Sequence, residues 1–223
     1  MTKVFNEVFN KYDLMNDLMS FGTHRLWKSK LIDWMSPRQN QHLIDVASGT
    51  GDVARAFLKE TNFSGKVSCV EPNKNMLKIG EKKLKNLANV KWYCAQAEKL
   101  PFKDETFDIY VVSFGIRNFS NIRLALNESR RVLKTGGRFL CLEFSKVNNE
   151  ILSEFYKKYS KMIPYIGKYI VGKSEPYEYL IKSIKDFYSQ EELLNLIKSS
   201  GFKSVEFRDL SGGIAAIHSG WKI

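Results

Sequence analysis

The sequence has few cysteines and few prolines, and it contains no run of about 18 apolar residues that could span a bilayer. Its cysteines, Cys69, Cys94 and Cys141, are widely spaced and never form a C-x-x-C pair. This spacing argues against a disulfide framework and a zinc knuckle, so we expect small buried thiols in a reducing compartment. The first residues include no apolar signal region. We therefore expect a cytoplasmic protein that does not span a membrane.

The composition is that of a folded protein. Hydrophobic residues make up 43% of the 223 positions and charged residues 26%, with 14 glycines and 5 prolines, which excludes collagen-like and disordered chains. We expect one domain over residues 1–223. The 35 basic and 24 acidic side chains give a net charge of +11. This excess predicts an anionic partner, and charge alone leaves nucleic acid, an anionic membrane and an acidic small molecule open.

Short apolar runs alternate with helical patterns over residues 42–145. Strands are expected at 42–47, 66–71, 90–95, 106–113 and 138–144, and helices at 52–60, 75–87 and 122–133. The segment 134–137, with two glycines, is expected to stop the last of these helices. Strands separated by helices predict a doubly wound α/β core, with a parallel sheet and helices on both faces.

The C-terminal segment follows a different pattern. A helix is expected at 190–200, and strands at 203–210 and 214–218 are joined by Ser211, Gly212 and Gly213. Such a short connection predicts an antiparallel pair that closes the sheet.

A glycine loop carries the clearest chemistry. The segment 45–52 reads Asp-Val-Ala-Ser-Gly-Thr-Gly-Asp, so Gly49 and Gly51 let the backbone pass close to a ligand where a strand enters a helix. Glu71 ends the next strand, where a carboxylate can bind both hydroxyls of a ribose. The pattern predicts an adenosine-containing ligand. It also fits the dinucleotide fingerprint, and a glycine turn without a ligand is the structural alternative.

Two further features favour S-adenosylmethionine (SAM) over a dinucleotide. The segments 95–102, Ala-Gln-Ala-Glu-Lys-Leu-Pro-Phe, and Phe107-Asp108 resemble the class I methyltransferases, in which the residues after the third strand flank the adenine. Asp45 also lies four residues before Gly49, as in the acidic-x-x-x-Gly-x-Gly form of that superfamily.

The most specific motifs lie outside this loop. Residues 12–27 read YDLMNDLMSFGTHRLW, residues 113–118 SFGIRN, residues 131–145 RVLKTGGRFLCLEFS and residues 212–221 GGIAAIHSGW, with Tyr177-x-Tyr-Leu-x-x-Ser-Ile between the last two. Together they resemble the ubiquinone/menaquinone biosynthesis C-methyltransferase family (UbiE type) over essentially the whole chain. The resemblance implies a Rossmann-like α/β fold, with a seven-stranded, mainly parallel sheet, an antiparallel C-terminal strand and helices on both faces.

The resemblance also implies the residues of the cofactor site. It places SAM contacts at Thr50, Glu71, Gln96, Ala97 and Ser113, and the glycine loop adds Asp45, Gly49 and Gly51. The chain departs from the family pattern at three positions, with Thr135 in place of proline, Glu71 where many members have aspartate, and Lys182 where an acidic residue is common.

The implied reaction moves a methyl group to a ring carbon of a prenylated benzoquinol or naphthoquinol. Carbon is a poor nucleophile until a neighbouring hydroxyl loses its proton, so the site must favour the phenolate. Arg117 is the first candidate, because it follows the fourth expected strand on the cofactor side of the sheet. A guanidinium cannot act as an ordinary base near neutral pH, so its expected role is to stabilise the phenolate or to position a water molecule. His24 is the candidate base, with a structural role as the alternative. Tyr12 and Asp13 are expected to shape a lid.

Other features receive structural or accessory roles. His42 and His218 lie in expected strands, and no cluster has metal-ligand spacing, so no metal is expected. Residues 1–41 are expected to form a helical lid, 42–145 the cofactor-binding core, 146–189 a helical insertion facing substrate or membrane, and 190–223 the closing helix and strands.

One stretch of the insertion is basic and amphipathic. Between positions 151 and 173, five lysines and one glutamate interleave with apolar residues at helical spacing. Such a stretch binds an anionic membrane surface or covers the core with its lysines in solvent.

Several alternatives stay open in the sequence. They are a methyltransferase of another small phenol or lipid, a dinucleotide-dependent reductase and an RNA-binding protein, the last disfavoured by the absence of RNA-recognition motifs. The choice between ubiquinone and menaquinone precursors is open, as is a homodimer or a complex of quinone-biosynthesis enzymes.

Overall fold

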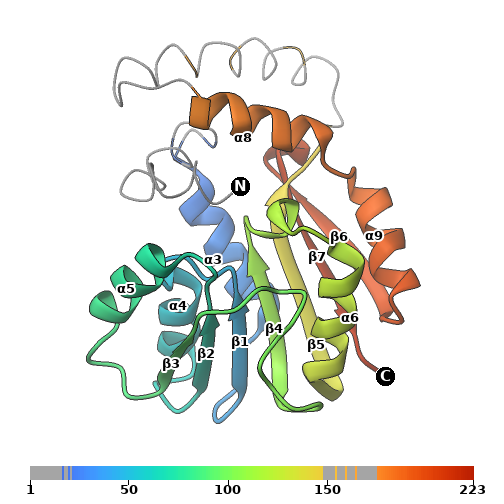
Figure 1. The fold of residues 1–223 in the computed structure, drawn as a ribbon. Helices are drawn as coiled ribbons and strands as arrows, with labels where there is room; N and C mark the ends of the chain where they lie inside the picture. Colours follow the sequence, from blue (N-terminus) through green and yellow to red (C-terminus); the bar gives the residue numbers. More distant parts are fainter. Residues whose placement is uncertain are drawn as a thin grey trace.

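A computed structural model describes residues 17, 20, 22–147, 154, 159, 164 and 175–223. Within them one sheet has the strand order β3-β2-β1-β4-β5-β7-β6 (Figure 1). Its strands are β1 (His42–Val46), β2 (Lys66–Val70), β3 (Val90–Tyr93), β4 (Phe107–Ser113), β5 (Leu133–Phe144), β6 (Lys203–Leu210) and β7 (Ala215–Trp221). Strands β1 to β5 pair in parallel, and β7 is antiparallel to both β5 and β6. The predicted sheet, including its antiparallel C-terminal strand, is confirmed.

Helices connect and cover these strands. They are α3 (His24–Met35), α4 (Asp52–Glu60), α5 (Lys74–Lys83), α6 (Ile122–Val132), α8 (Glu175–Asp186) and α9 (Gln190–Ser199), with short 3-10 turns η2 (Ile116–Asn118) and η3 (Ser211–Gly213). Side chains fix several helix starts: Asn73 accepts from two backbone N–H groups of α5, and Ser189 and Glu192 form a capping box at α9. None of the helices in the described residues is both long and apolar enough to cross a bilayer.

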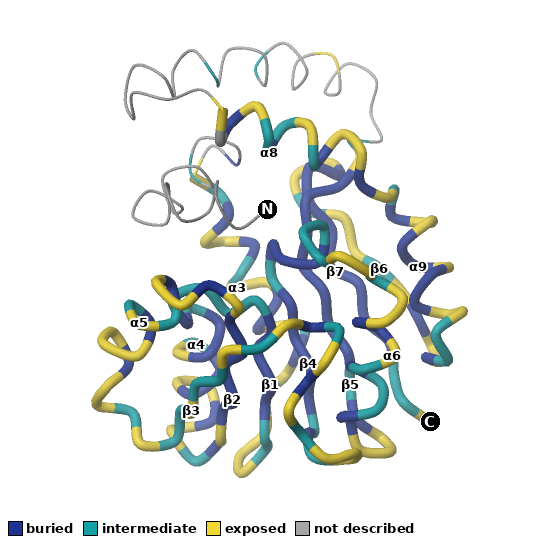
Figure 2. Tube along the Cα trace, viewed as in Figure 1, coloured by how far each residue is buried: buried dark blue, intermediate teal, exposed yellow. Residues whose placement is uncertain are grey.

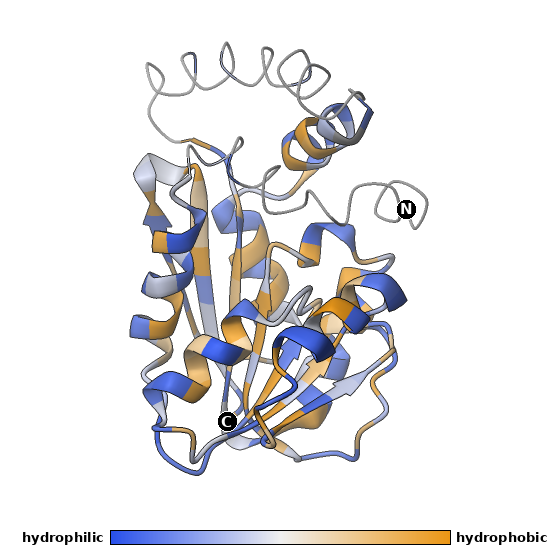
Figure 3. Cartoon of the chain, turned by 90° about the vertical axis from the view of Figure 1, so that its left-hand side faces the viewer, coloured by the Kyte–Doolittle hydropathy of each residue, from blue (hydrophilic) through white to orange (hydrophobic). Residues whose placement is uncertain are grey.

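The core consists of one apolar cluster on each face of the sheet. Alternate residues of a strand point to opposite faces, so Leu43 of β1 joins one cluster with α3, α4 and α8, while Ile44 joins the other with α6 and α9. Figure 2 shows the central strands as buried, and Figure 3 shows hydrophobic residues concentrated on them, with alternating hydropathy along the helices. Because both faces of the sheet are buried, residues that point to either face are apolar, and the strands read as nearly continuous apolar runs.

The expected element boundaries differ from the structure in a few places. Strand β5 begins at Leu133, where the sequence suggested Arg138, because Leu133 already pairs with Phe107. The Gly136 and Gly137 turn within it is held by two backbone hydrogen bonds to Lys222, which follows β7. Helix α5 ends at Lys83, whereas the sequence suggested a helix to 87.

The expectation for the cysteines is correct at two of three positions. Cys69 and Cys141 are buried, while Cys94 is exposed. Cys94 comes just after β3, an edge strand of the sheet with only one neighbouring strand. A residue there lacks the cover that the inner strands receive.

The topology defines a binding edge. The chain runs outwards from β1 to β2 and β3, and then returns to β4 on the other side of β1, so the connections that begin after β1 and β4 lead to opposite halves of the sheet. In open α/β sheets, ligands bind at this switch point, outside the carboxyl ends of the strands. We call this the carboxyl edge; helix α8 lies above it in Figure 1.

Candidate functional site

The loops after β1 and β4 approach each other closely at the carboxyl edge. A side-chain Cβ placed on Gly115, which follows β4, would lie 2.5 Å from the Cβ of Ala47, which follows β1. Only a glycine allows this approach without displacing the first loop. The structure therefore brings the predicted glycine loop and the predicted SFGIRN motif together.

The glycine loop has the left-handed backbone that its glycines permit. Gly49 has a φ of +57° and Gly51 a φ of +83°, and helix α4 starts directly afterwards at Asp52. The Gly51 N–H donates to the carbonyl of Ser48 at 2.9 Å. A Cβ on Gly51 would lie 2.6 Å from the side chain of Leu84, so this turn is closely packed as well as strained for any other residue.

Glu71 joins the second strand to this loop. Its Oε2 accepts the backbone N–H of Gly49 and its Oε1 that of Asn73, both at 2.9 Å. Burial raises the pKa of the Glu71 carboxyl, and these two N–H donors act against that rise. The predicted ribose-binding carboxylate thus contacts the predicted glycine loop directly.

Asp45 lies beneath the loop on β1 and is buried, with 1% of its surface exposed. The backbone N–H of Ala54 bonds its carboxylate, but its Oδ2 has no hydrogen-bond partner in the described residues. Burial raises the pKa of Asp45 to about 8, opposed mainly by the charge of Lys28. The hydroxyl of Ser113, at the end of β4, is likewise buried without a partner in that part of the chain. Two unpaired polar atoms at the ends of neighbouring strands fit a polar ligand such as SAM.

Two lysines that no local motif indicates support the loop from outside. Lys28 of α3 reaches Asp52 Oδ2 at 2.9 Å, and Lys83 of α5 reaches Asp52 Oδ1 at 2.5 Å and Thr50 Oγ1 at 3.3 Å. Burial acts to raise the pKa of Asp52, but the charges and hydrogen bonds of the two lysines outweigh it and lower that pKa. Thr50, a predicted cofactor contact, therefore belongs to a network that joins three helices.

Gln96 and Ala97 follow β3 at the same edge. Gln96 is exposed and forms a small bridge with Lys99, whereas Ala97 is buried against the apolar cluster that contains Val70. Gln96 can therefore offer its side chain to a ligand, and Ala97 its backbone. All eight predicted cofactor residues thus lie on β1 to β4 or on the segments that follow them.

Arg117, the first catalytic candidate, forms a buried ion pair. Its side chain is 1% exposed and that of Glu143, at the end of β5, is 2% exposed. Arg117 Nη1 donates to Glu143 Oε1 at 2.5 Å and to the carbonyl of Phe114 at 2.9 Å. Burial raises the pKa of Glu143, while the charge of Arg117 and the N–H of Phe144 oppose that rise. Glu143 is not among the predicted site residues, and the signal for it in the sequence is a single carboxylate inside an apolar strand.

His24, the second candidate, lies in the first turn of α3. Its imidazole is buried, and Nδ1 lies 3.3 Å from both Asp17 Oδ1 and Ser20 Oγ. The Trp27 ring, one turn further along, packs against Phe114 and Phe144 with ring centroids 6.3 and 5.9 Å apart. Helix α3 therefore lies against the segments that carry Arg117 and Glu143.

The other predicted residues have simple outcomes. His42 bonds Ser68, and His218 is buried with Nε2 2.9 Å from the carbonyl of Gln190; burial lowers the pKa of His218 to about 4. Both contacts fit the structural role expected for these histidines. Tyr12, Asp13 and most of the basic stretch lie outside the described residues. No group of three metal-ligating side chains is found in the part of the chain that the structure describes.

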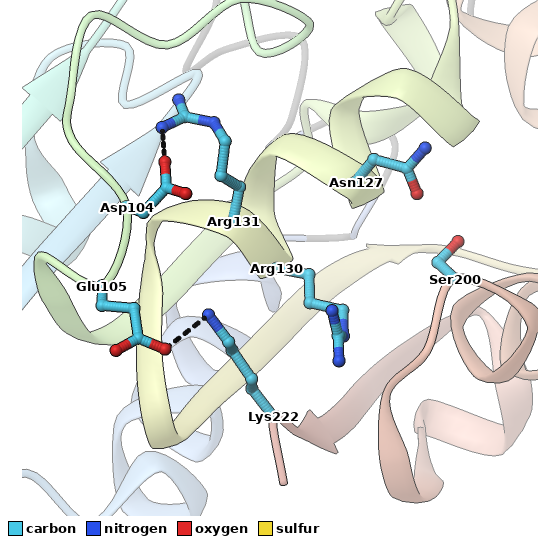
Figure 4. A pocket seen from close by; sticks show the side chains of 7 residues that line it. All are labelled: Asp104, Glu105, Asn127, Arg130, Arg131, Ser200 and Lys222. Carbon is cyan, nitrogen blue, oxygen red and sulfur yellow. Dashed lines mark hydrogen bonds and ion pairs between the residues drawn. The ribbon is translucent and has the colours of Figure 1, made fainter.

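A cavity of about 620 Å³ lies at the opposite, amino edge of the parallel strands (Figure 4). Its basic side chains are engaged: Arg131 bonds Asp104, Lys222 bonds Glu105 and the carbonyl of Leu133, and Arg130 bonds the carbonyl of Gly201. Two of these contacts place a cation on a backbone carbonyl just after a helix, at Leu133 after α6 and at Gly201 after α9. The basic groups of the cavity thus bind the protein itself, and the cavity lies away from the carboxyl edge.

The fold and the carboxyl-edge site together define an SAM-dependent methyltransferase. A crystal structure of such an enzyme from Thermotoga maritima matches with a TM-score of 0.70 and 23% sequence identity, over 100% of both chains. At that identity the match shows the fold.

The chain belongs to the ubiE/COQ5 methyltransferase family, whose model matches residues 1–222. It is 48% identical over 224 residues to a protein of Ruegeria sp., covering 99% of this chain and 89% of the relative. It is 49% identical over 230 residues to a protein of Rickettsia akari, covering 100% and 92%. Both relatives are named ubiquinone/menaquinone biosynthesis C-methyltransferase UbiE. The predicted family, the SAM cofactor and the C-methyltransferase class are confirmed.

Proposed function

We propose that this enzyme methylates a ring carbon of a prenylated benzoquinol or demethylmenaquinol in ubiquinone or menaquinone biosynthesis. The family and the names of its relatives supply the reaction class. The observation that supports the position of the substrate is the buried Arg117–Glu143 pair, which lies at the ends of β4 and β5 beside the glycine loop. A phenolic ring held there would face the cofactor edge.

The cofactor residues divide the work of binding. Bound SAM supplies an electrophilic methyl group on a sulfonium. Glu71 is proposed to accept hydrogen bonds from the ribose hydroxyls, and the loop of Gly49, Thr50 and Gly51 to pass beneath the ligand. Asp45 and Ser113 have unpaired oxygens for further polar groups.

Gln96 and Ala97 are proposed to flank the adenine. The exposed Gln96 side chain offers an amide after β3, while the buried Ala97 fixes the course of the backbone there. Both residues follow β3. Strand β3 pairs with β2, and Glu71 comes directly after β2.

The protein's part in catalysis is to favour the phenolate and to align the ring carbon. Alignment contributes roughly 7–11 kcal/mol in favourable cases. Arg117 is proposed to stabilise the developing oxyanion, and Glu143 to keep its guanidinium in place. One hydrogen-bond donor aimed at such a charge lowers the activation barrier by about 3 kcal/mol. His24, with Asp17 beside its Nδ1, is proposed as the base that takes the phenolic proton.

Deleting the gene and extracting the quinones tests this function. We expect mass spectrometry to show a precursor one methyl group lighter than the normal quinone, and complementation to restore the normal pool. An Arg117→Ala gene should complement poorly. A normal quinone pool in the deletion strain would overturn the assignment, and the mass of the precursor distinguishes the ubiquinone from the menaquinone branch.

We propose further that the enzyme works at the inner face of the membrane. A prenylated quinol resides in the bilayer, and the chain carries five lysines between positions 151 and 173. Tyr159, an apolar residue of that stretch, packs against the protein core, so we assign the membrane contact to the lysines. Binding to anionic but not neutral liposomes, weakened by salt, is the expected result; equal binding to both would contradict it.

A further inference from the structure

The η2 turn places two polar residues, Arg117 and Asn118, next to each other at the carboxyl edge. Arg117 Nη1 uses its two hydrogens on Glu143 and on the carbonyl of Phe114. This guanidinium nitrogen is therefore committed to the protein itself. Arg117 has other guanidinium N–H groups for a phenolate oxygen, and such an oxygen can accept from a second donor beside them.

Asn118 has the capacity that this nitrogen lacks. The Tyr179 hydroxyl of α8 donates to Asn118 Oδ1 at 3.1 Å. An amide has one acceptor oxygen and one nitrogen with two hydrogens, so the contact fixes which end of the amide faces α8. Asn118 Nδ2 makes no hydrogen bond within the residues that the structure describes.

Tyr179 is suited to remain the donor. It is half-buried, and burial raises the pKa of its phenol while the charge of Arg117 acts in the opposite direction. The hydroxyl thus stays protonated near neutral pH and keeps Asn118 Oδ1 occupied. Figure 1 shows α8 above the carboxyl edge, and the Tyr179–Asn118 contact joins α8 to η2.

We propose that Asn118 donates a hydrogen bond from Nδ2 to the oxyanion of the quinol substrate, and that Tyr179 is the positioning residue that holds the Asn118 amide in this orientation. The inference rests on the proposed quinol methylation. It assigns to α8 a part in the chemistry, because a donor fixed in advance stabilises developing charge without reorganisation. The alternative is that the Tyr179–Asn118 bond only attaches α8 to η2.

Steady-state kinetics with SAM and a short-chain demethylated quinol separate these roles. We expect Asn118→Ala to lower kcat about a hundredfold, as for loss of one oxyanion donor, and Tyr179→Phe about tenfold, with SAM affinity unchanged in both. Tyr177→Phe is the matched control, because Tyr177 is on the same helix and its buried hydroxyl has no hydrogen-bond partner in the described residues. It should retain the wild-type kcat.

Two further variants distinguish positioning from attachment. If Tyr179 acts through Asn118, the Tyr179→Phe change should have no additional effect on kcat in the Asn118→Ala background. Asn118→Asp keeps an acceptor for Tyr179 but replaces the donor by an anion, so kcat should fall further and the acidic limb of its pH profile should move to higher pH. Independent, multiplying effects, or a Tyr179→Phe enzyme equal to Tyr177→Phe, would overturn the inference.

A spectroscopic test does not depend on turnover. 4-Nitrophenol reports its ionisation by absorbance, and we expect its pKa to be lower when bound to the wild type with SAM than when bound to Asn118→Ala. Equal pKa values, or no binding by either protein, would refute the role of Asn118. If the wild type lowers this pKa but methylates no quinol, the proposed function fails and the oxyanion site stands.

Discussion

Arg117 and Glu143 show how much the site depends on one buried contact. Both side chains are almost fully excluded from solvent, so each charge relies on the other and on nearby backbone groups. Removing one partner of such a pair leaves an uncompensated charge inside the protein. The pair thus serves stability as well as the proposed chemistry.

Glu143→Gln should accordingly destabilise the fold. We expect a loss of roughly 3–5 kcal/mol in the free energy of unfolding, because Arg117 stays buried without its counter-charge. Asp33→Asn is the control: Asp33 pairs with Lys30 on the surface of α3, and breaking an exposed pair should change stability by less than about 0.5 kcal/mol. Urea unfolding of both variants checks this; similar losses would show that the Arg117–Glu143 pair contributes little.

The residues that the sequence identified are those with a local signal. Gly49, Gly51 and Glu71 could be predicted because a turn and a strand end constrain their spacing. Lys28, Lys83 and Glu143 could not, because their partners lie 24, 31 and 26 positions away in the chain. Only the folded sheet brings them together.

At the scale of elements, the passage from β1 into α4 is tightly constrained. Gly51 combines a left-handed backbone with a neighbour 2.6 Å from its would-be Cβ. Gly136, in the turn within β5, has nearly the same backbone, with a φ of +80°, and nothing within 4 Å. Substitutions at the two glycines therefore distinguish the effect of backbone strain from the effect of steric overlap.

We expect Gly136→Ala to cost about 1 kcal/mol of stability from strain alone, and to leave SAM binding unchanged. Gly51→Ala should cost more and weaken SAM binding at least tenfold, because Leu84 or the loop must move. Urea unfolding and calorimetric titration with SAM provide the comparison. Equal SAM affinities for the two variants would contradict the role given to the glycine loop.

Element types were easier to predict than their ends. Helix α4 begins and ends where its apolar spacing and glycine loop indicated, and strands β1, β2 and β4 agree within a residue or two. Strand β5 was underestimated because the pairing of Leu133 with Phe107 is a tertiary contact. The two glycines at 136 and 137 lie in a turn within β5, but from the local sequence alone they indicate the end of a helix.

For the whole molecule, the buried ionisable groups set how stability depends on pH. The pKa of Asp45 is raised to about 8, and that of Glu71 is raised as well. A carboxyl that holds its proton more tightly when folded makes stability fall as pH rises from its unfolded pKa, about 4, to its folded pKa. His218 acts in the opposite sense, because its lowered pKa of about 4 makes stability rise between pH 4 and about 6.5.

Without SAM, the protein should therefore be most stable at mildly acidic pH and lose stability towards pH 9. Asp45→Asn should flatten the alkaline side, and its stability relative to wild type should be at least about 1 kcal/mol greater at pH 9 than at pH 5. Urea unfolding across this range measures both curves. Parallel curves for the two proteins would mean that Asp45 does not titrate as its burial implies.

The strand order has a consequence for how the chain reaches its native state. Strand β7 is synthesised after both β5 and β6, yet it lies between them in the sheet. Until it emerges from the ribosome, β5 has an open edge and β6 has no partner, so the nascent chain carries unpaired backbone that can associate with other chains. Chains truncated before β7 should therefore aggregate rather than fold into a slightly shorter enzyme.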